Sequence, residues 1–183
     1  ADFAAVPVHD GQKIKVGIVG EIYMKYSPLG NNNLEEFLLQ EGAEVEVPGL
    51  LDFILYTCDN GATDARLYGS KKITSRLTSL LTKYLINMQT MMIDAVKTQR
   101  CFKAPSSFAH IKSLIPDFIG TGTKMGEGWL LTAEMLELVT SGVDNIVCTQ
   151  PFGCLPNHIV GKGMIRRIKE SYPNANIVAI YYD

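Results

Sequence analysis

The chain alternates short apolar runs with segments in which apolar residues recur every three or four positions. The first run, KIKVGIVG at 13–20, is rich in β-branched residues and ends at a glycine, as buried strands often do. LEEFLLQEG at 34–42 then predicts a short helix, and AEVEVPG at 43–49 predicts a second strand that a Pro-Gly pair stops. Strand, helix and strand in this order form a βαβ unit, so we expect parallel strands.

The start of the first helix carries a capping signal. Asn33 lies directly before the helical pattern, and Glu36 lies three residues further on. A polar side chain in this position accepts a hydrogen bond from the free backbone N–H groups of the first turn. We therefore expect Asn33 to cap this helix.

The middle of the chain predicts helices rather than strands. Residues 50–60 form an apolar run that fits a buried strand or a helix, and the preceding Pro-Gly loop favours the helix. Residues 70–99 carry the longest helical pattern, with a methionine-rich apolar face. Because this pattern interrupts the alternation of strands and helices, we interpret residues 60–104 as a helical insertion. Core packing is the favoured role of its apolar face, and a homodimer contact through helix 70–99 is the alternative.

The second half of the chain returns to the alternating pattern. Its order is helix, helix, strand, helix, strand, which is again typical of a parallel sheet. The expected elements are helices at 105–120, 128–142 and 157–171 and strands at 143–150 and 175–183.

Together these elements predict a three-layer α/β sandwich with a parallel sheet of at least four strands, similar to flavodoxin-like or Rossmann-like folds. Residues 13–183 would form a single α/β domain, and residues 1–12 a linker or an added tail. The chain stops directly after a strand that a covering helix would ordinarily follow, so we expect a fragment of a longer protein. Ligands of such sheets bind beyond the carboxyl ends of the strands, where loops 20–33, 48–60 and 148–157 should meet.

Composition and charge argue against two classes of partner. The 183 residues are 46% apolar and 20% charged, which suits a globular domain with its own core. A net charge of −2 gives no excess of clustered Lys and Arg, so we expect neither nucleic acid nor a membrane surface as a partner. No apolar run reaches the roughly 20 residues of a membrane helix, and the first residues lack a signal-peptide pattern. We therefore expect a cytoplasmic protein whose four cysteines are free thiols or ligands.

The segment with the clearest potential for chemistry is CTQPFGCLPNHIVGKGM at 148–164. Cys148 lies near the carboxyl end of a strand, and Cys154 lies in the turn before the next helix. The amide groups at a helix start stabilise the thiolate form, which binds metals and acts as a nucleophile. The C-x5-C spacing is not that of a zinc finger, a ferredoxin or a thioredoxin, so Cys148 can equally be a small buried hydrophobe. Cys58 would supply a third thiolate if it lies beside the same crevice.

Other candidates lie in the neighbouring loops. Asn157 is expected to cap the helix after the turn, and His158 is a ligand, an acid or base, or a cap partner, although a structural role is commoner for a lone histidine. Glu21 and Tyr23 follow the first strand, where they would face the crevice; a polar surface loop is the alternative. The glycine-rich GTGTKMGEG at 120–128 fails the Walker pattern, so a connection is favoured over anion binding.

Several stretches of the chain resemble a known family. VGIVGEIYMKYSPLGNNNLEEFL, EVEVPGLLDFILY, GEGWLLTAEMLELV and the segment from NIVCTQPFGCLPNH to the C-terminus resemble the acyl-CoA dehydratase activase-related proteins. These are large proteins of anaerobic bacteria that join ATPase activator modules to a region similar to the 2-hydroxyacyl-CoA dehydratase subunits. The resemblance covers nearly all the chain after residue 13, and QPFGCLPNH is its most distinctive part. It implies that this chain is the C-terminal part of the dehydratase-like region.

The resemblance implies a [4Fe–4S] or related iron–sulfur cluster, held by cysteines of different domains and used in low-potential electron transfer or 2-hydroxyacyl-CoA dehydration. Carried over to this chain, Cys154 is the first ligand candidate, Cys148 the second and Cys58 the weakest. These are too few for a whole cluster, so the other ligands would come from missing domains of the parent chain. Further partners would be the activator ATPase modules and an acyl-CoA. The parent would be a lyase or an ATP-dependent redox enzyme, and we expect the isolated piece to be inactive.

Two other function classes stay open. A CoA-thioester or nucleotide binding module without metal would have an open crevice lined by Glu21, Tyr23 and the glycine-rich loop, with Cys154 turned away. An interaction domain that docks the activator modules would expose an apolar stripe along helix 70–99. The cluster hypothesis instead requires Cys154 at the carboxyl edge of the sheet, with a second cysteine within cluster distance.

Overall fold

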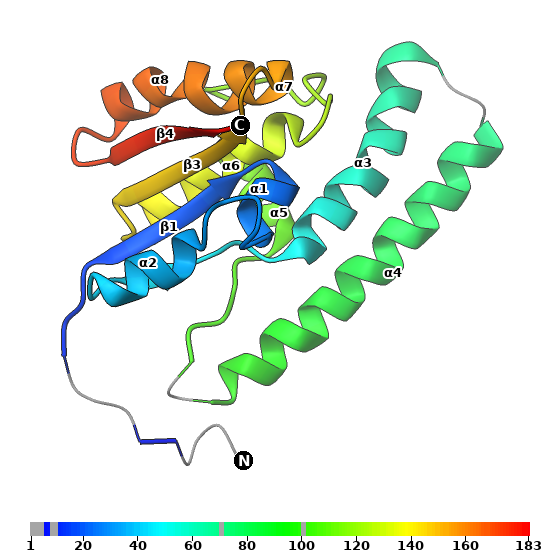
Figure 1. Cartoon of the computed structure of the whole chain (residues 1–183). Helices are drawn as coiled ribbons and strands as arrows, with labels where there is room; N and C mark the ends of the chain where they lie inside the picture. Colours follow the sequence, from blue (N-terminus) through cyan, green and yellow to red (C-terminus); the bar gives the residue numbers. More distant parts are fainter. Residues whose placement is uncertain (1–5, 8–10, 70–71, 100–101) are drawn as a thin grey trace.

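Four parallel strands form the sheet, in the order β2-β1-β3-β4, and the predicted three-layer α/β fold is confirmed (Figure 1). The computed structural model describes residues 6–7, 11–69, 72–99 and 102–183, and for 72–75 the backbone alone. Most of the expected linker at 1–12 lies outside these ranges. The strands are β1 (Lys15–Gly20), β2 (Glu44–Glu46), β3 (Asn145–Pro151) and β4 (Asn176–Tyr182).

The strand order places a topological switch point between β1 and β3. β1 pairs with β2 on one side, with Val16 opposite Val45, and with β3 on the other, with Val19 opposite Cys148. The right-handed connections from β1 to β2 and from β2 to β3 run in opposite directions across the sheet. The helices within them, α2 (Leu34–Gln40) and α6 (Gly128–Thr140), therefore cover opposite faces of the sheet (Figure 1). The carboxyl ends of β1 and β3 are therefore the place where folds of this kind bind ligands.

Helix α6 lies at the centre of the core. It is apolar around nearly its whole circumference, as expected for a helix enclosed on all sides, and Trp129 and Met135 are fully buried. The Trp129 ring packs edge-on against Tyr56, with centroids 5.2 Å apart, and lies 5.9 Å from the ring of Phe108. Through these contacts α6 joins the sheet to the helices on its outer side.

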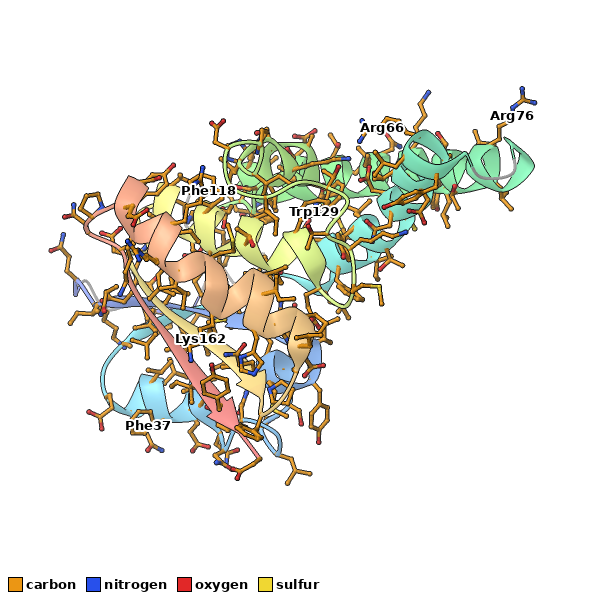
Figure 2. The ribbon with its side chains drawn as sticks, turned by 90° about the horizontal axis from the view of Figure 1, so that it is seen from above. Phe37, Arg66, Arg76, Phe118, Trp129 and Lys162 are labelled. Carbon is orange, nitrogen blue, oxygen red and sulfur yellow. The ribbon has the colours of Figure 1, made fainter. Side chains whose placement is uncertain are left out.

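Two long helices form an arm that projects from the α/β body (Figures 1 and 2). They are α3 (Leu50–Tyr68) and α4 (Lys72–Lys97), so the ambiguous run at 50–60 is helical, as expected. The helical insertion is confirmed, although it begins about ten residues earlier than predicted. No helix in the described ranges combines the length and the apolar character needed to cross a bilayer.

The helix predicted at 105–120 is much shorter than expected. α5 (Phe108–Ser113) begins after Ser107, whose Oγ accepts a hydrogen bond from the backbone N–H of His110 at 3.3 Å. Pro116 follows soon after the helix end, and the residue before a proline is disfavoured in helical geometry. The apolar pattern continues past this point, which is why the sequence overestimated the helix.

The prediction that Asn33 caps α2 is also wrong. Asn33 has a left-handed backbone, with φ of 56°, and its side chain makes no capping hydrogen bond. The Oδ1 of Asn31 instead accepts a hydrogen bond from Leu34 N at 3.1 Å, while its Nδ2 donates to Met24 O at 2.8 Å. Asparagine tolerates the left-handed region better than most residues, which explains a run of asparagines in this turn.

The last helical segment starts two residues before the predicted Asn157. It comprises α7 (Leu155–Asn157), a π-helical turn η2 (His158–Lys162) and α8 (Gly163–Ser171). A Cβ at Gly161 would lie 3.0 Å from the Leu131 side chain and 3.1 Å from the Cys148 Sγ. Glycine therefore lets this turn approach the sheet closely, as its presence inside a predicted helix indicated.

Candidate functional site

The backbones of β1 and β3 are locked together at the switch point. Gly20 ends β1 with φ of 142°, and a Cβ there would lie 1.8 Å from Thr149 O. The next residue, Glu21, donates its backbone N–H to the same oxygen at 3.0 Å. Only glycine fits this approach, which fixes where the loops after the two strands begin.

The loop after β1 uses its polar residues for local structure. Glu21 caps α1 (Ile22–Tyr26), and its Oε2 accepts a hydrogen bond from Met24 N at 2.9 Å. Tyr23 is half exposed, and its ring lies against Gly30. Ligand binding by Glu21 and Tyr23 therefore stays a prediction.

Cys154 lies at the carboxyl edge of the sheet, in the turn that follows β3. The turn passes through Gly153, whose φ of 76° is left-handed, and Cys154 is the N-cap residue of α7. Its thiol makes no capping bond with the described helix amides, contrary to the expected source of stabilisation. Asn157 Nδ2 donates to the Cys154 Sγ instead, at 3.2 Å. The hydrogen bond expected from the helix backbone therefore comes from the Asn157 side chain.

Two buried amide side chains near this turn have polar atoms without partners among the described residues. They are Gln150, through both Nε2 and Oε1, and Asn157, through Oδ1. Both residues are fully buried, and each unpaired polar group of this kind costs about 1–3 kcal/mol. Such atoms are rare in folded proteins and occur where a functional group or ordered water supplies the missing bond.

Cys148 lies in the core rather than at the edge. It is fully buried, and its Sγ lies 3.1 Å from the position that a Cβ at Gly161 would take. Burial raises the pKa of Cys148 to about 12, and the carboxyl groups of Glu134 and Glu127 add to the rise. At neutral pH the residue is an uncharged thiol, which matches the alternative reading of a small buried hydrophobe.

The remaining sequence candidates do not join Cys154 in a metal centre. Cys58 is a half-buried residue of α3, on the arm. His158 stacks on the Tyr181 ring, with centroids 5.2 Å apart, and its Nδ1 lies 3.4 Å from the tyrosine hydroxyl. In the part of the chain that the structure describes, no three His, Cys, Asp or Glu side chains are grouped to hold a metal ion.

Sequence reasoning missed a buried ion pair that ties the loop after β1 to α6. Lys25 Nζ lies 2.9 Å from Glu134 Oε1, and both side chains are 3% exposed. Burial lowers the pKa of Lys25, but Glu134 and Tyr26 together more than offset this, so the pKa lies above its ordinary value. Burial raises the pKa of Glu134, and the Lys25 ammonium opposes that rise. The available signal was Glu134 itself, a carboxylate in a largely apolar stretch of α6 that needs a buried partner.

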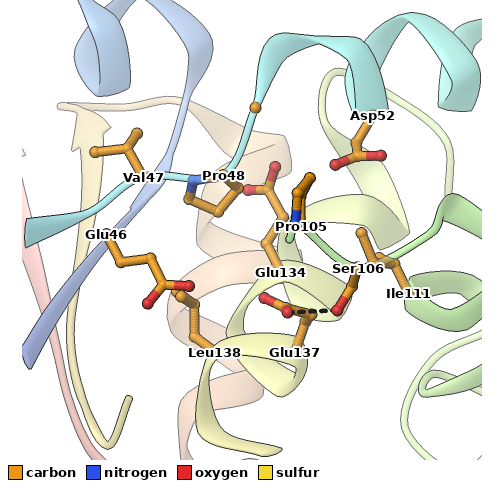
Figure 3. A pocket seen from close by; sticks show the side chains of 11 residues that line it. Glu46, Val47, Pro48, Asp52, Pro105, Ser106, Ile111, Glu134, Glu137 and Leu138 are labelled. Carbon is orange, nitrogen blue, oxygen red and sulfur yellow. Dashed lines mark hydrogen bonds between the residues drawn. The ribbon is translucent and has the colours of Figure 1, made fainter. Parts of the chain in front are cut away.

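A small acidic pocket lies beyond the end of β2 (Figure 3). Its volume is about 90 Å³, and Glu46, Asp52, Glu134 and Glu137 are among its lining residues. Burial raises the pKa of Asp52 to about 6, although Gln89 Nε2 opposes this by donating to Oδ1 at 2.8 Å. Binding pockets for organic ligands usually measure about 300–1,000 Å³, so a CoA thioester or nucleotide does not fit here.

The glycine-rich loop connects the arm to the body. Lys124 pairs with Asp64 of α3, and Tyr56 OH donates to Gly126 O at 3.2 Å. Glu127 Oε1 accepts a hydrogen bond from Ile22 N at 3.2 Å, next to the switch point. These contacts hold the loop against α3 and α1, and the choice between a connection and an anion site stays a prediction.

Comparison of the chain with models of protein families, with curated proteins and with solved structures found no match. Within the described residues, Cys154 is the sequence candidate that lies in the turn after β3, beside the switch point of the sheet.

Proposed function

We propose that this chain is a dehydratase-like domain of an activase-related protein and that it supplies Cys154 as one ligand of an iron–sulfur cluster. The observation that carries the proposal is a half-buried thiol beyond β3 with the Asn157 amide directed at its sulfur. Thiolates are the usual ligands of such clusters, and hydrogen bonds to the sulfurs adjust their reduction potential. A cytoplasmic location belongs to this proposal, because the thiol has to stay reduced.

The described residues fit one ligand position and not a complete cluster. Cys148 is an uncharged core thiol, and no further cysteine of the described chain joins Cys154 in a metal-binding group. The other ligands would come from the rest of the parent chain, and the electrons from its activator ATPase modules. When bound, the cluster would supply low-potential electron transfer or the dehydration of a 2-hydroxyacyl-CoA.

Within this arrangement each residue of the chain has a separate task. Cys154 would bind iron through Sγ, and Asn157 would orient that sulfur through its side-chain amide. Gln150 and the Oδ1 of Asn157 offer unpaired polar groups next to the turn. Glu21 and Tyr23 follow β1, on the other side of the switch point, and we propose that they contact an acyl-CoA there.

Replacing Cys154 with serine should remove most of the iron that the full-length parent protein binds on anaerobic reconstitution with iron and sulfide. Serine keeps the size of the side chain but is a poor ligand for iron of this type. The measurements are the iron and sulfide content per chain and the visible absorption of the cluster.

The matched control is Cys148→Ala, which changes the buried thiol. We expect this variant to be less stable but to bind iron like the wild type, because the Cys148 thiol is not ionised at neutral pH. Circular dichroism shows whether both variants are folded. Undiminished iron in folded Cys154→Ser protein would remove Cys154 from the ligand set and overturn the proposal.

A further inference from the structure

Helix α4 carries an apolar face that nothing in the described chain covers. Its residues follow a heptad spacing of alternately four and three positions, which is the pattern of a helix that packs against another helix. Leu77 is 69% exposed, Tyr84 61% and Met91 59%. The heptad face consists of Leu77, Leu81, Tyr84, Met88, Met91 and Ala95, and all six residues are exposed.

The opposite face of α4, which packs on α3, is less apolar than the heptad face. It includes the half-buried Thr82 and the buried Gln89 beside Leu85 and Ile93. Gln89 is occupied by polar contacts, since Nε2 donates to Asp52 and Oε1 accepts a hydrogen bond from Phe108 N at 3.0 Å. A helix with one neighbour turns its most apolar side towards that neighbour. In α4 the more apolar face instead points away from α3, which indicates a second helix contact. The prediction that core packing explains the methionine-rich face is therefore wrong.

We propose that a second copy of this chain covers the heptad face, with the two α4 helices antiparallel. A two-fold interface uses the same surface on both copies, so the surface has to be complementary to itself. In the antiparallel heptad register Leu77 meets Ala95 of the second copy, Leu81 meets Met91, and Tyr84 meets Met88. Large residues thus face smaller or flexible ones, and methionine adapts its shape to such contacts.

The charges at the ends of the heptad face favour the antiparallel orientation. Arg76 precedes the face and Asp94 lies at its other end, with Lys83 as the one charged residue between them in the sequence. Antiparallel packing brings Arg76 of each copy towards Asp94 of the other, whereas parallel packing would bring like charges together. The contact of Asp94 with Lys97 of its own helix is long, at 4.0 Å, and exposed, so it does not compete strongly.

The position and size of the surface fit this partner. The arm extends away from the α/β body, and Arg76 marks its far end in Figure 2, so a second arm can lie along α4. A specific interface buries about 800 Å² on each partner, and the heptad face with its exposed neighbours Leu80 and Met92 offers apolar surface of that order. Contiguous apolar patches of this size are uncommon on monomers.

Sedimentation equilibrium of the chain over about a hundredfold range of concentration tests the proposal. We expect a dimer for the wild type, and at least a tenfold weaker dimer for Leu81→Glu, which puts a carboxylate into the heptad face. Ser79→Glu is the matched control, because it adds the same charge at an exposed position of α4 outside the heptad face, and it should leave the dimer unchanged. Circular dichroism confirms that both variants keep their helices.

A charge exchange tests the orientation. Arg76→Glu and Asp94→Arg should each weaken the dimer, and the double variant should recover it, because the two opposite charges then meet again. Wild-type protein that stays monomeric throughout the range would overturn the proposal and assign the face to a different protein, such as an activator module. A dimer that Leu81→Glu leaves intact, or a double variant weaker than both single variants, would also overturn it.

Discussion

Replacing Glu134 with glutamine should destabilise the protein by about 3–5 kcal/mol, because it leaves the charge of Lys25 buried without a counter-ion. The two groups lie 2.9 Å apart with side chains that are 3% exposed, so water does not screen the loss. Folded domains have a total stability of about 5–15 kcal/mol, and this change therefore removes a large part of it. Urea unfolding followed by circular dichroism measures the effect as a lower midpoint.

Two further variants make this prediction specific to the buried pair. Glu170→Gln breaks the exposed Arg166–Glu170 pair, whose 2.9 Å contact is similar, and should cost less than about 1 kcal/mol. The double variant Lys25→Met/Glu134→Leu removes both charges and should recover most of the lost stability. Equal midpoints for Glu134→Gln and Glu170→Gln would show that the buried Lys25–Glu134 pair stabilises the protein no more than the exposed pair does.

Replacing Gly20 with alanine should cost on the order of 4 kcal/mol or more, enough to prevent folding in a marginally stable domain. The new Cβ would lie 1.8 Å from Thr149 O, and the backbone φ of 142° is one that residues with a side chain rarely adopt. Both obstacles involve backbone atoms, so a change of rotamer cannot relieve them. Soluble yield and the urea midpoint measure the loss.

Gly49→Ala is the control for this substitution. Gly49 precedes α3 with φ of −72°, and a Cβ there meets no atom within 4 Å, so the change should be within about 1 kcal/mol of neutral. If Gly20→Ala unfolded at the same urea concentration as Gly49→Ala, the close approach of β1 and β3 at the switch point would be refuted.

The sheet was predictable because its signals are local. The first strand is buried from Val16 to Gly20 and therefore reads as a continuous run of β-branched and apolar residues, and the strand at 143–150 contains a shorter run of this kind, Ile146–Cys148. A strand end and a helix start on either side of Cys154 are also local, which is why the sequence places this thiol at the edge. The Asn157 contact lies only three residues away from Cys154, but the sequence indicated a backbone cap in its place.

The features that the sequence did not reveal depend on residues far apart in the chain. Lys25 and Glu134 are 109 positions apart, and nothing in a short polar loop shows that its lysine is buried. The raised pKa of Cys148 likewise follows from burial by other elements. For α4, periodicity identified an apolar face but not the element that contacts it. In the structure, α3 packs against the more polar side of α4.

The central claim, that Cys154 is the ligand-binding thiol and Cys148 a core residue, is tested most directly by alkylation of the native parent protein, read out for each cysteine by mass spectrometry. Alkylation requires an accessible sulfur that can ionise. The account predicts that metal-free protein is labelled at Cys154 and spared at Cys148, and that anaerobic reconstitution with iron and sulfide protects Cys154. Labelling of Cys154 to the same extent before and after reconstitution, in protein shown to contain iron, would contradict it.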